Sequence, residues 1–194
     1  MLTKARTFRC FIAAYPNREA LDGIAPFLDG MRARNTLVKW ERLPLLHITV
    51  KFLGDSTAEL VRSLDVLLRR NLQDVRPFTA LLDTPGGFPH FRKPKVVWLG
   101  FSQRCRELDV IHRAVEDACV TLGYPRELKS FTPHFTIGRI SAERRVFDLE
   151  KDVRACRFQA VPVTFSDLRI MESTLAPGGA QHREVYRIEF NGAQ

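Results

Sequence analysis

The stretch Leu46-His-Ile-Thr-Val-Lys-Phe52 alternates strictly between apolar and polar residues. Successive side chains of a strand point to opposite faces of a sheet, so this alternation predicts a strand with one apolar face in the core. The other face then carries His47, Thr49 and Lys51 together. A strand of this kind holds polar groups in fixed positions at the surface of a rigid core.

The same pattern returns later as His134-Phe-Thr-Ile137, with His134 and Thr136 on one face and the apolar residues on the other. This local duplication, in a chain without a repeat of fixed period, is the strongest signal in the sequence. Two strands of matching polarity predict two lobes that face each other across a cleft.

Paired histidines suit the cleavage of phosphodiesters without a metal. One imidazole removes a proton from the attacking oxygen while the other protonates the departing oxygen. An ordinary pKa near 6.5 allows one ring to be neutral and the other charged at about neutral pH. A threonine hydroxyl two residues along can donate a hydrogen bond to a phosphate oxygen. One His-x-Thr alone is typical of a polar surface pair, whereas two favour catalysis.

Around the motifs, periodicity predicts a β-α-β-β-α-β first half and a second half that again mixes strands and helices. The first half comprises strands over 6–15, 37–40, 45–53 and 78–83, with helices over 17–31 and 57–72. The second comprises strands over 96–101, 135–140, 157–163, 167–172 and 185–190, with helices over 102–122 and 143–149. The Pro- and Gly-rich stretch 84–95 predicts a loop that joins the halves.

Composition is that of a globular domain, with 194 residues, 45% hydrophobic and 27% charged, which argues against a disordered chain. The net charge of +8 favours a polyanionic partner such as nucleic acid. The apolar runs are far shorter than the ~20 residues that span a bilayer, and the N-terminus lacks the features of a secretory signal. We therefore expect a cytoplasmic protein that does not bind membranes. Four widely spaced cysteines fit reduced thiols better than disulfides or a zinc site.

Both motifs, and the blocks around them, resemble the 2H phosphoesterase superfamily and, within it, the bacterial and archaeal RNA 2',3'-cyclic phosphodiesterases, formerly called 2'-5' RNA ligases. The resemblance covers nearly the whole chain. It is carried by Phe8-Arg-Cys-Phe-Ile-Ala-Ala14, His47-Ile-Thr-Val-Lys-Phe-Leu-Gly54, Gly87-Phe-Pro, Val97-Trp-Leu-Gly100, Phe131-Thr-Pro-His-Phe-Thr-Ile-Gly-Arg139 and Met171-Glu-Ser-Thr-Leu-Ala-Pro-Gly178.

This resemblance implies a bilobal α+β fold in which two antiparallel sheets flank a central cleft, with helices on the outside. Residues 1–194 would then form one domain of two pseudo-symmetric lobes. It also implies hydrolysis of an RNA 2',3'-cyclic phosphate end to a 2'-phosphate, without cofactor or metal, by a chain that we expect to be a monomer. His47 would donate and His134 accept a proton, although these roles can be exchanged. Thr49 and Thr136 match the phosphate-binding positions.

Two further cations are candidates for substrate binding. Lys51 shares the polar face of the first motif in the strict alternation, and it either pairs with phosphate or is an ordinary exposed lysine. Alternation sends Arg139 to the face opposite His134, so a functional role requires a bulge or a strand end. Family likeness alone keeps Arg139 among the candidates.

The loop that holds Phe91 and Arg92 mixes aromatic and basic residues, which would stack an RNA base and hold its backbone, or form a plain linker. His112 lies beside the apolar stripe of its helix and is expected at the surface or boundary. His182 belongs to the stretch 178–186, which is longer than the usual tail of the family, so any substrate contact there is in doubt.

Two alternatives stay open at this point. The first is a phosphodiesterase or ligase that acts on 2'-5' linkages or small cyclic nucleotides at the same site. The second is a module that binds RNA ends without turnover. The sequence lacks the G-x-x-x-x-G-K motif that cradles nucleotide phosphates, so it offers no support for ATP-driven ligation.

Overall fold

The structure, a computed structural model, describes residues 6–91, 93–141, 149–176 and 179–191. The elements are β1 (Thr7–Ala14), α1 (Arg18–Arg34), β2 (Lys39–Trp40), the 3-10 turn η1 (Leu43–Leu45), β3 (Ile48–Thr57), α2 (Ala58–Asn71), β4 (Phe78–Leu82), β5 (Thr84–Phe88), β6 (Val96–Gly100), α3 (Arg106–Thr121), β7 (His134–Arg139), α4 (Leu149–Cys156), β8 (Val161–Phe165), β9 (Asp167–Ala176) and β10 (Gly179–Glu189). The short helix expected over 143–149 falls almost entirely outside the described residues.

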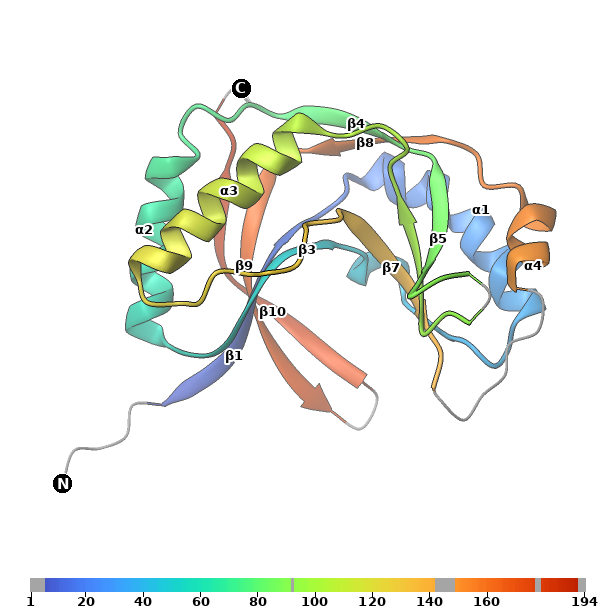
Figure 1. Cartoon of the computed structure of the whole chain (residues 1–194), viewed down its shortest axis with the longest axis horizontal. Helices are drawn as coiled ribbons and strands as arrows, with labels where there is room; N and C mark the ends of the chain where they lie inside the picture. Colours follow the sequence, from blue (N-terminus) through green and yellow to red (C-terminus); the bar gives the residue numbers. More distant parts are fainter. Residues whose placement is uncertain (1–5, 92, 142–148, 177–178, 192–194) are drawn as a thin grey trace.

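Eight strands form a curved antiparallel sheet in the order β10-β9-β1-β3-β7-β6-β5, with β2 paired to β7. We call β10-β9-β1-β3 the first half-sheet and β2, β7, β6 and β5 the second half-sheet. The resemblance implied two antiparallel sheets; in the structure they are the two halves of one sheet, and they meet where Ile48 of β3 pairs with Phe135 of β7. Figure 1 shows the two halves curving around a central opening. A separate two-stranded sheet joins β4 and β8.

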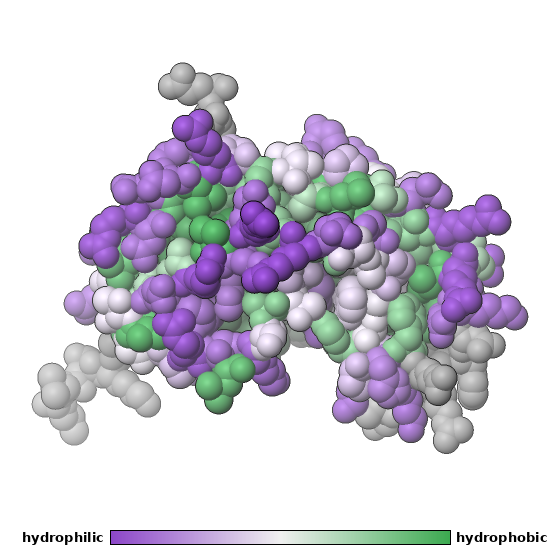
Figure 2. Space-filling model, turned by 45° about the horizontal axis from the view of Figure 1, so that its top comes forward, coloured by the Kyte–Doolittle hydropathy of each residue, from purple (hydrophilic) through white to green (hydrophobic). Residues whose placement is uncertain are grey.

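Helices cover the outside of both halves (Figure 1). The helices α2 and α3 contact each other and lie against the first half-sheet, whereas α1 contacts α4 and β8 on the other side. The helix α2 begins where the Thr57 hydroxyl accepts a hydrogen bond from the Leu60 amide, as an N-cap residue does. The outward-facing residues in the view of Figure 2 are largely hydrophilic, as amphipathic helices require. The α+β class expected from the sequence is confirmed.

The chain crosses between the two half-sheets several times. Between β6 and β7, which pair in the second half-sheet, the chain passes through α3, which packs on β3 of the first half-sheet. The segment 122–133 then leads from the end of α3 back to His134 at the start of β7. Each motif therefore belongs to a different half-sheet. The segment 122–133, which leads into the second motif, nevertheless starts at the end of α3, beside the first half-sheet.

Two stretches expected to be loops are strands. Residues 84–88 of the expected joint form β5, which pairs with β6, so this stretch lies within one half-sheet and does not link the halves. Residues 179–184, also expected in a loop, extend the strand predicted over 185–190 toward the N-terminus, so that β10 runs over Gly179–Glu189 and pairs with β9. Both stretches contain residues with low strand propensity, Pro and Gly in the first and Gly in the second. Hydrogen bonding to a neighbouring strand outweighs this low propensity. None of the described helices has both the length and the apolar character needed to cross a membrane.

Candidate active site

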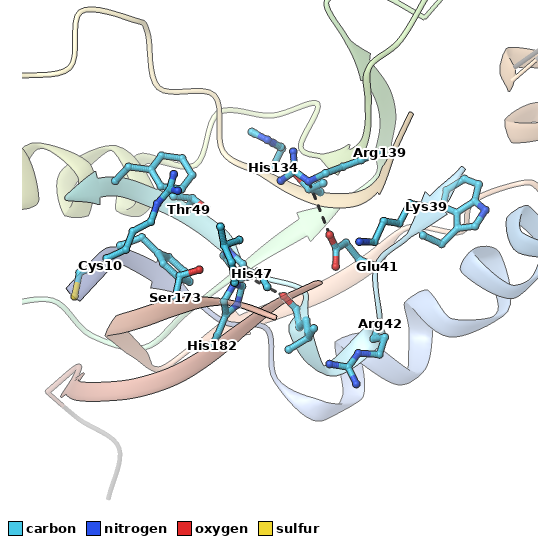
Figure 3. A pocket seen from close by; sticks show the side chains of 18 residues that line it. Cys10, Lys39, Glu41, Arg42, His47, Thr49, His134, Arg139, Ser173 and His182 are labelled. Carbon is cyan, nitrogen blue, oxygen red and sulfur yellow. Dashed lines mark hydrogen bonds and ion pairs between the residues drawn. The ribbon is translucent and has the colours of Figure 1, made fainter. Parts of the chain in front are cut away.

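A cleft of about 520 Å³ runs between the two half-sheets, within the range of small-molecule sites. Figure 3 shows side chains from both halves converging on it. It is lined, among the described residues, by Arg9, Cys10, Phe11, Lys39, Trp40, Glu41, Arg42, Leu45, His47, Thr49, Phe52, His134, Thr136, Arg139, Ser173, Leu175, Ala180 and His182. Both His-x-Thr motifs therefore open into one cavity.

The backbone orients both motif histidines in the same way. Nδ1 of His47 lies 2.7 Å from the carbonyl oxygen of Leu45, and Nδ1 of His134 lies 2.7 Å from that of Thr132. A carbonyl oxygen only accepts hydrogen bonds, so each Nδ1 carries the hydrogen and donates it. The Nε2 atom of each ring is then left for chemistry, as a base when the ring is neutral and as an acid when it is charged.

His47 is packed among rings of the first half-sheet. The ring of Phe11 lies 5.0 Å away, that of Tyr15 5.5 Å and that of His182 5.4 Å. Burial lowers the pKa of His47 to about 4, against the opposing effect of its hydrogen bond to Leu45; positive charge on His182 and Arg139 lowers it further. His47 is therefore neutral at pH 7 in the free protein.

His134 is packed by aromatic residues of the second half-sheet. Phe88 meets it edge-on at 5.0 Å, and the ring of Trp98 lies 6.1 Å away. Burial lowers the pKa of His134, and Arg139 lowers it further. Trp98 occupies the space above Gly86, where any Cβ would come within 2.1 Å of the indole. A glycine at this position of β5 is thus what allows the indole to lie beside the histidine.

One extra residue interrupts the alternation after each threonine. In β3, Lys51 pairs with Ile12 and Thr49 with Ala13, so Val50 is the inserted residue. In β7, Gly138 pairs with Val97 and Thr136 with Trp98, so Ile137 is inserted. A bulge of this kind reverses the facing of the side chains that follow it, in β3 as far as a second bulge at Leu53.

The first bulge makes the expected position of Lys51 wrong. Its side chain is 5% exposed and lies on the helix side of the sheet, where Nζ is 2.6 Å from Oε1 of Glu116 in α3. Phe52, which the alternation assigns to the core, lines the cleft instead and is 68% exposed. The first bulge thus takes Lys51 away from the cleft. The second bulge does the reverse for Arg139, which it brings to the cleft beside His134.

Positive charge reaches the cleft from both half-sheets. Among the described lining residues, Arg9, Lys39, Arg42 and Arg139 are cationic and only Glu41 is a carboxylate, which lies 3.9 Å from the Arg139 Nε (Figure 3). A phosphate that enters this cleft therefore meets excess positive charge. Composition alone predicted the net charge but not its location.

Of the loop near residue 91, none of the described residues lines the cleft. Phe91 packs against the hydrophobic core, and Arg92 lies outside the described residues. From the stretch 84–91, the aromatic residue that contacts His134 is Phe88, at the end of β5. Its signal in the sequence was hidden by the Gly-Gly-Phe-Pro turn composition.

Sequence reasoning also missed His182. It lies on β10, opposite Ser173 of β9, and lines the cleft with its ring edge-on to Phe11 at 4.8 Å. The stretch 178–186 was expected to be a loop, and no motif marks its histidine. His112, by contrast, stays on the outer side of the sheet in α3, as expected, half-buried against Phe131.

A bilobal antiparallel fold with a His-x-Thr strand from each half defines the 2H phosphoesterase type. The sequence profile of the 2'-5' RNA ligase superfamily matches residues 21–175, and the chain belongs to this superfamily. The chain is 26% identical over 185 residues to the RNA 2',3'-cyclic phosphodiesterase of Methanothermobacter thermautotrophicus, covering 93% of this chain and 98% of that protein. It is 28% identical over 187 residues to that of Thermotoga maritima, covering 95% and 96%.

Solved structures show the same fold. E. coli LigT complexed with 3'-AMP aligns with a TM-score of 0.75 at 22% identity, covering 96% of this chain and 100% of LigT. A Thermus thermophilus protein aligns with a TM-score of 0.77 at 20% identity, covering 96% of this chain and 100% of that one. At these identities the likeness concerns the fold alone.

Proposed function

We propose that the protein is a hydrolase that opens the 2',3'-cyclic phosphate at the end of an RNA to a 2'-phosphate, and that it needs no metal. The observation that carries the proposal is that two histidines from separate strands share one cleft, each with Nδ1 hydrogen-bonded to the backbone. Relatives over nearly the full chain carry the name RNA 2',3'-cyclic phosphodiesterase.

In the proposed reaction, water attacks the phosphorus and gives a proton to Nε2 of His134. The bond from phosphorus to the 3'-oxygen breaks, and Nε2–H of protonated His47 gives its proton to that oxygen. The 2'-phosphate and a free 3'-hydroxyl result, and solvent exchange restores both rings. Each proton transfer contributes about 10²- to 10⁴-fold to the rate.

His47 must be charged for this step although burial holds its pKa at about 4 in the free protein. A bound phosphate brings a negative charge beside the ring, which favours the imidazolium and raises that pKa. Substrate binding and protonation of His47 are thus coupled.

Thr49 and Thr136 are assigned to the non-bridging phosphate oxygens, because both line the cleft two residues after their histidines. Arg139 is assigned to the same anion, since its bulge brings the guanidinium to the cleft. Hydrogen bonds to oxygens that gain charge in the transition state lower the barrier. Lys51 has no part in this contact, because it faces the helices.

We further propose that residues 1–194 act as one domain and that the protein works in the cytoplasm. The cysteines Cys10, Cys105, Cys119 and Cys156 are free thiols, which suits a reducing compartment. The partner is the phosphorylated end of an RNA, which the excess positive charge of the cleft favours.

The test is an oligoribonucleotide ending in a 2',3'-cyclic phosphate, incubated with the protein in excess EDTA. The proposal expects a 2'-phosphate product, identified by its ³¹P spectrum, and loss of turnover in His47→Ala and His134→Ala. A 2'-5'-linked dinucleotide and a cyclic mononucleotide are run in parallel, and faster turnover of either would replace the proposed substrate. Activity abolished by EDTA, or retained by both variants, would contradict the proposal, and binding without turnover would indicate a module that only recognises RNA ends.

A further inference from the structure

A buried ion pair lies directly behind the first motif. Nζ of Lys51 is 2.6 Å from Oε1 of Glu116, and the two side chains are 5% and 2% exposed. Burying two charges costs so much desolvation that apolar residues of similar volume commonly give equal or greater stability. A contribution to stability therefore does not by itself explain why this pair is buried here, and the other contacts of the two side chains point to a further role.

Both members of the pair also bind the backbone of the segment 122–133. Lys51 Nζ donates a hydrogen bond to the carbonyl oxygen of Pro125 at 2.9 Å, and Oε2 of Glu116 accepts one from the amide of Glu127 at 3.1 Å. The hydroxyl of Tyr124 donates to Oγ of Ser56, farther along β3, at 2.9 Å. The start of this segment is therefore tied to β3, the strand that follows His47.

The end of the same segment is tied to the pair through an aromatic contact. His112 lies one helical turn before Glu116, with Nε2 3.9 Å from Oε1 of that residue. Its ring stacks on Phe131, with centroids 4.3 Å apart and planes 1° from parallel. The next residue, Thr132, supplies the carbonyl oxygen that accepts from Nδ1 of His134 at 2.7 Å. A continuous series of contacts thus joins Lys51 to the second motif.

Little else in the sheet fixes the two motifs relative to each other. The strands β3 and β7 share the register pair Ile48–Phe135, while the longer ladders lie within the half-sheets. We infer that Lys51 and Glu116 are positioning residues, which hold the segment 122–133 so that the Thr132 carbonyl sets the His134 ring against His47. This inference rests on the proposed function for its catalytic consequence, but not for its geometry.

The test compares Lys51→Met, Glu116→Leu and the double variant Lys51→Met/Glu116→Leu. Each single change leaves a buried charge without its partner and lowers the thermal midpoint. The double variant removes both charges, so its thermal midpoint should return most of the way to the wild-type value. It still lacks the two backbone anchors, so kcat with the cyclic phosphate falls by about 10- to 100-fold while KM changes little, because the cleft lining is intact.

A more exposed ion pair elsewhere, which also binds a strand carbonyl, provides the control. Arg69 Nη2 lies 3.0 Å from Oδ1 of Asp65 in α2 and donates to the carbonyl oxygen of Arg187 in β10 at 2.7 Å. The variant Arg69→Met/Asp65→Leu likewise removes an ion pair that binds a strand carbonyl, but away from the cleft. It is expected to leave kcat unchanged at temperatures where it is folded.

A second measurement does not depend on turnover. The ¹⁵N spectrum of the imidazoles reports which nitrogen carries the hydrogen. In the double variant the Nδ1–H form of His134 should give way to a mixture of tautomers, while His47 keeps its Nδ1–H form. If the wild-type protein does not turn over the cyclic phosphate but the double variant still shows this spectral change, the proposed function is refuted and the positioning role stands. A double variant with wild-type kcat and an unchanged His134 spectrum would overturn the positioning role.

Discussion

Ile48 and Phe135 face each other across β3 and β7 in the register pair that joins the two half-sheets. Both side chains are fully buried, so the pair belongs to the core. His47 and Thr49 flank Ile48 along the chain, and His134 and Thr136 flank Phe135, so the pair lies at the centre of both motifs. The point where the half-sheets pair is therefore also the point where the two motifs come together.

The pH dependence of catalysis follows from the burial of the two rings. Burial lowers the pKa of His47 to about 4 and lowers that of His134 below its ordinary value of 6.5. The profile of kcat/KM against pH reports the pKa values of the free enzyme. We expect a bell whose maximum lies below pH 6.5 and whose acid limb falls near pH 4. A maximum above pH 7.5 would contradict the environment described for these rings.

Removing the charge of Arg139 should move that profile. The guanidinium lowers the pKa of both histidines by repelling their charged forms, so Arg139→Gln raises both values. Both limbs of the bell are then expected at higher pH, together with a lower kcat/KM because a phosphate contact is lost. The control is Arg154→Gln on α4, which removes an equal charge from an exposed ion pair outside the cleft. If the pH profile of kcat/KM does not shift in Arg139→Gln, or shifts equally in the control, the charge of Arg139 does not set the pKa values of the histidines.

The close approach of Gly86 to Trp98 makes a prediction about His134. In Gly86→Ala the new Cβ would lie 2.1 Å from the indole, so the ring that packs beside His134 must move. Overpacking of this kind costs about 1–3 kcal/mol of stability, measured by chemical denaturation. We expect kcat to fall as well, at temperatures where the variant is folded. Gly23→Ala, whose Cβ would lie 3.0 Å from the Val161 side chain, lies outside the cleft lining and should leave kcat unchanged. Equal kcat in both variants would show that the position of the indole is unimportant.

Phe52 should contribute to substrate binding rather than to stability. Its side chain is 68% exposed and lines the cleft, where an RNA base can stack on it. Stacking of a base on an aromatic side chain is worth about 1–3 kcal/mol, so Phe52→Ala should raise KM for an oligonucleotide about 5- to 150-fold. The thermal midpoint should hardly change. Val66→Ala, at an exposed apolar position of α2, serves as control, and an unchanged KM in Phe52→Ala would remove the residue from the binding surface.

Much of the site could be predicted from sequence because it depends on local patterns. The His-x-Thr pairs, each with apolar neighbours in step, indicated strands with one polar face, and both histidines and both threonines do line one cleft. The apolar stripes of α2 and α3 likewise predicted helices that bury one side. These features need only the periods of strand and helix.

What could not be predicted depends on pairing between distant strands. The bulges at Val50 and Ile137 leave no mark in the alternation, so Lys51 was assigned to the wrong face and Phe52 to the core. A bulge exists only relative to the register of a neighbouring strand. His182 was missed for a similar reason, because its place in the cleft follows from the pairing of β10 with β9.

The account depends most on the claim that one imidazole protonates the leaving oxygen while the other activates water on the same phosphorus. Its most direct test is a cyclic substrate in which sulfur replaces the bridging 3'-oxygen, because a thiolate leaves without needing a proton donor. The account predicts that this substrate restores much of the rate lost in His47→Ala and none of that lost in His134→Ala. Equal responses of the two variants would contradict it, and rescue of His134→Ala alone would reverse the two roles.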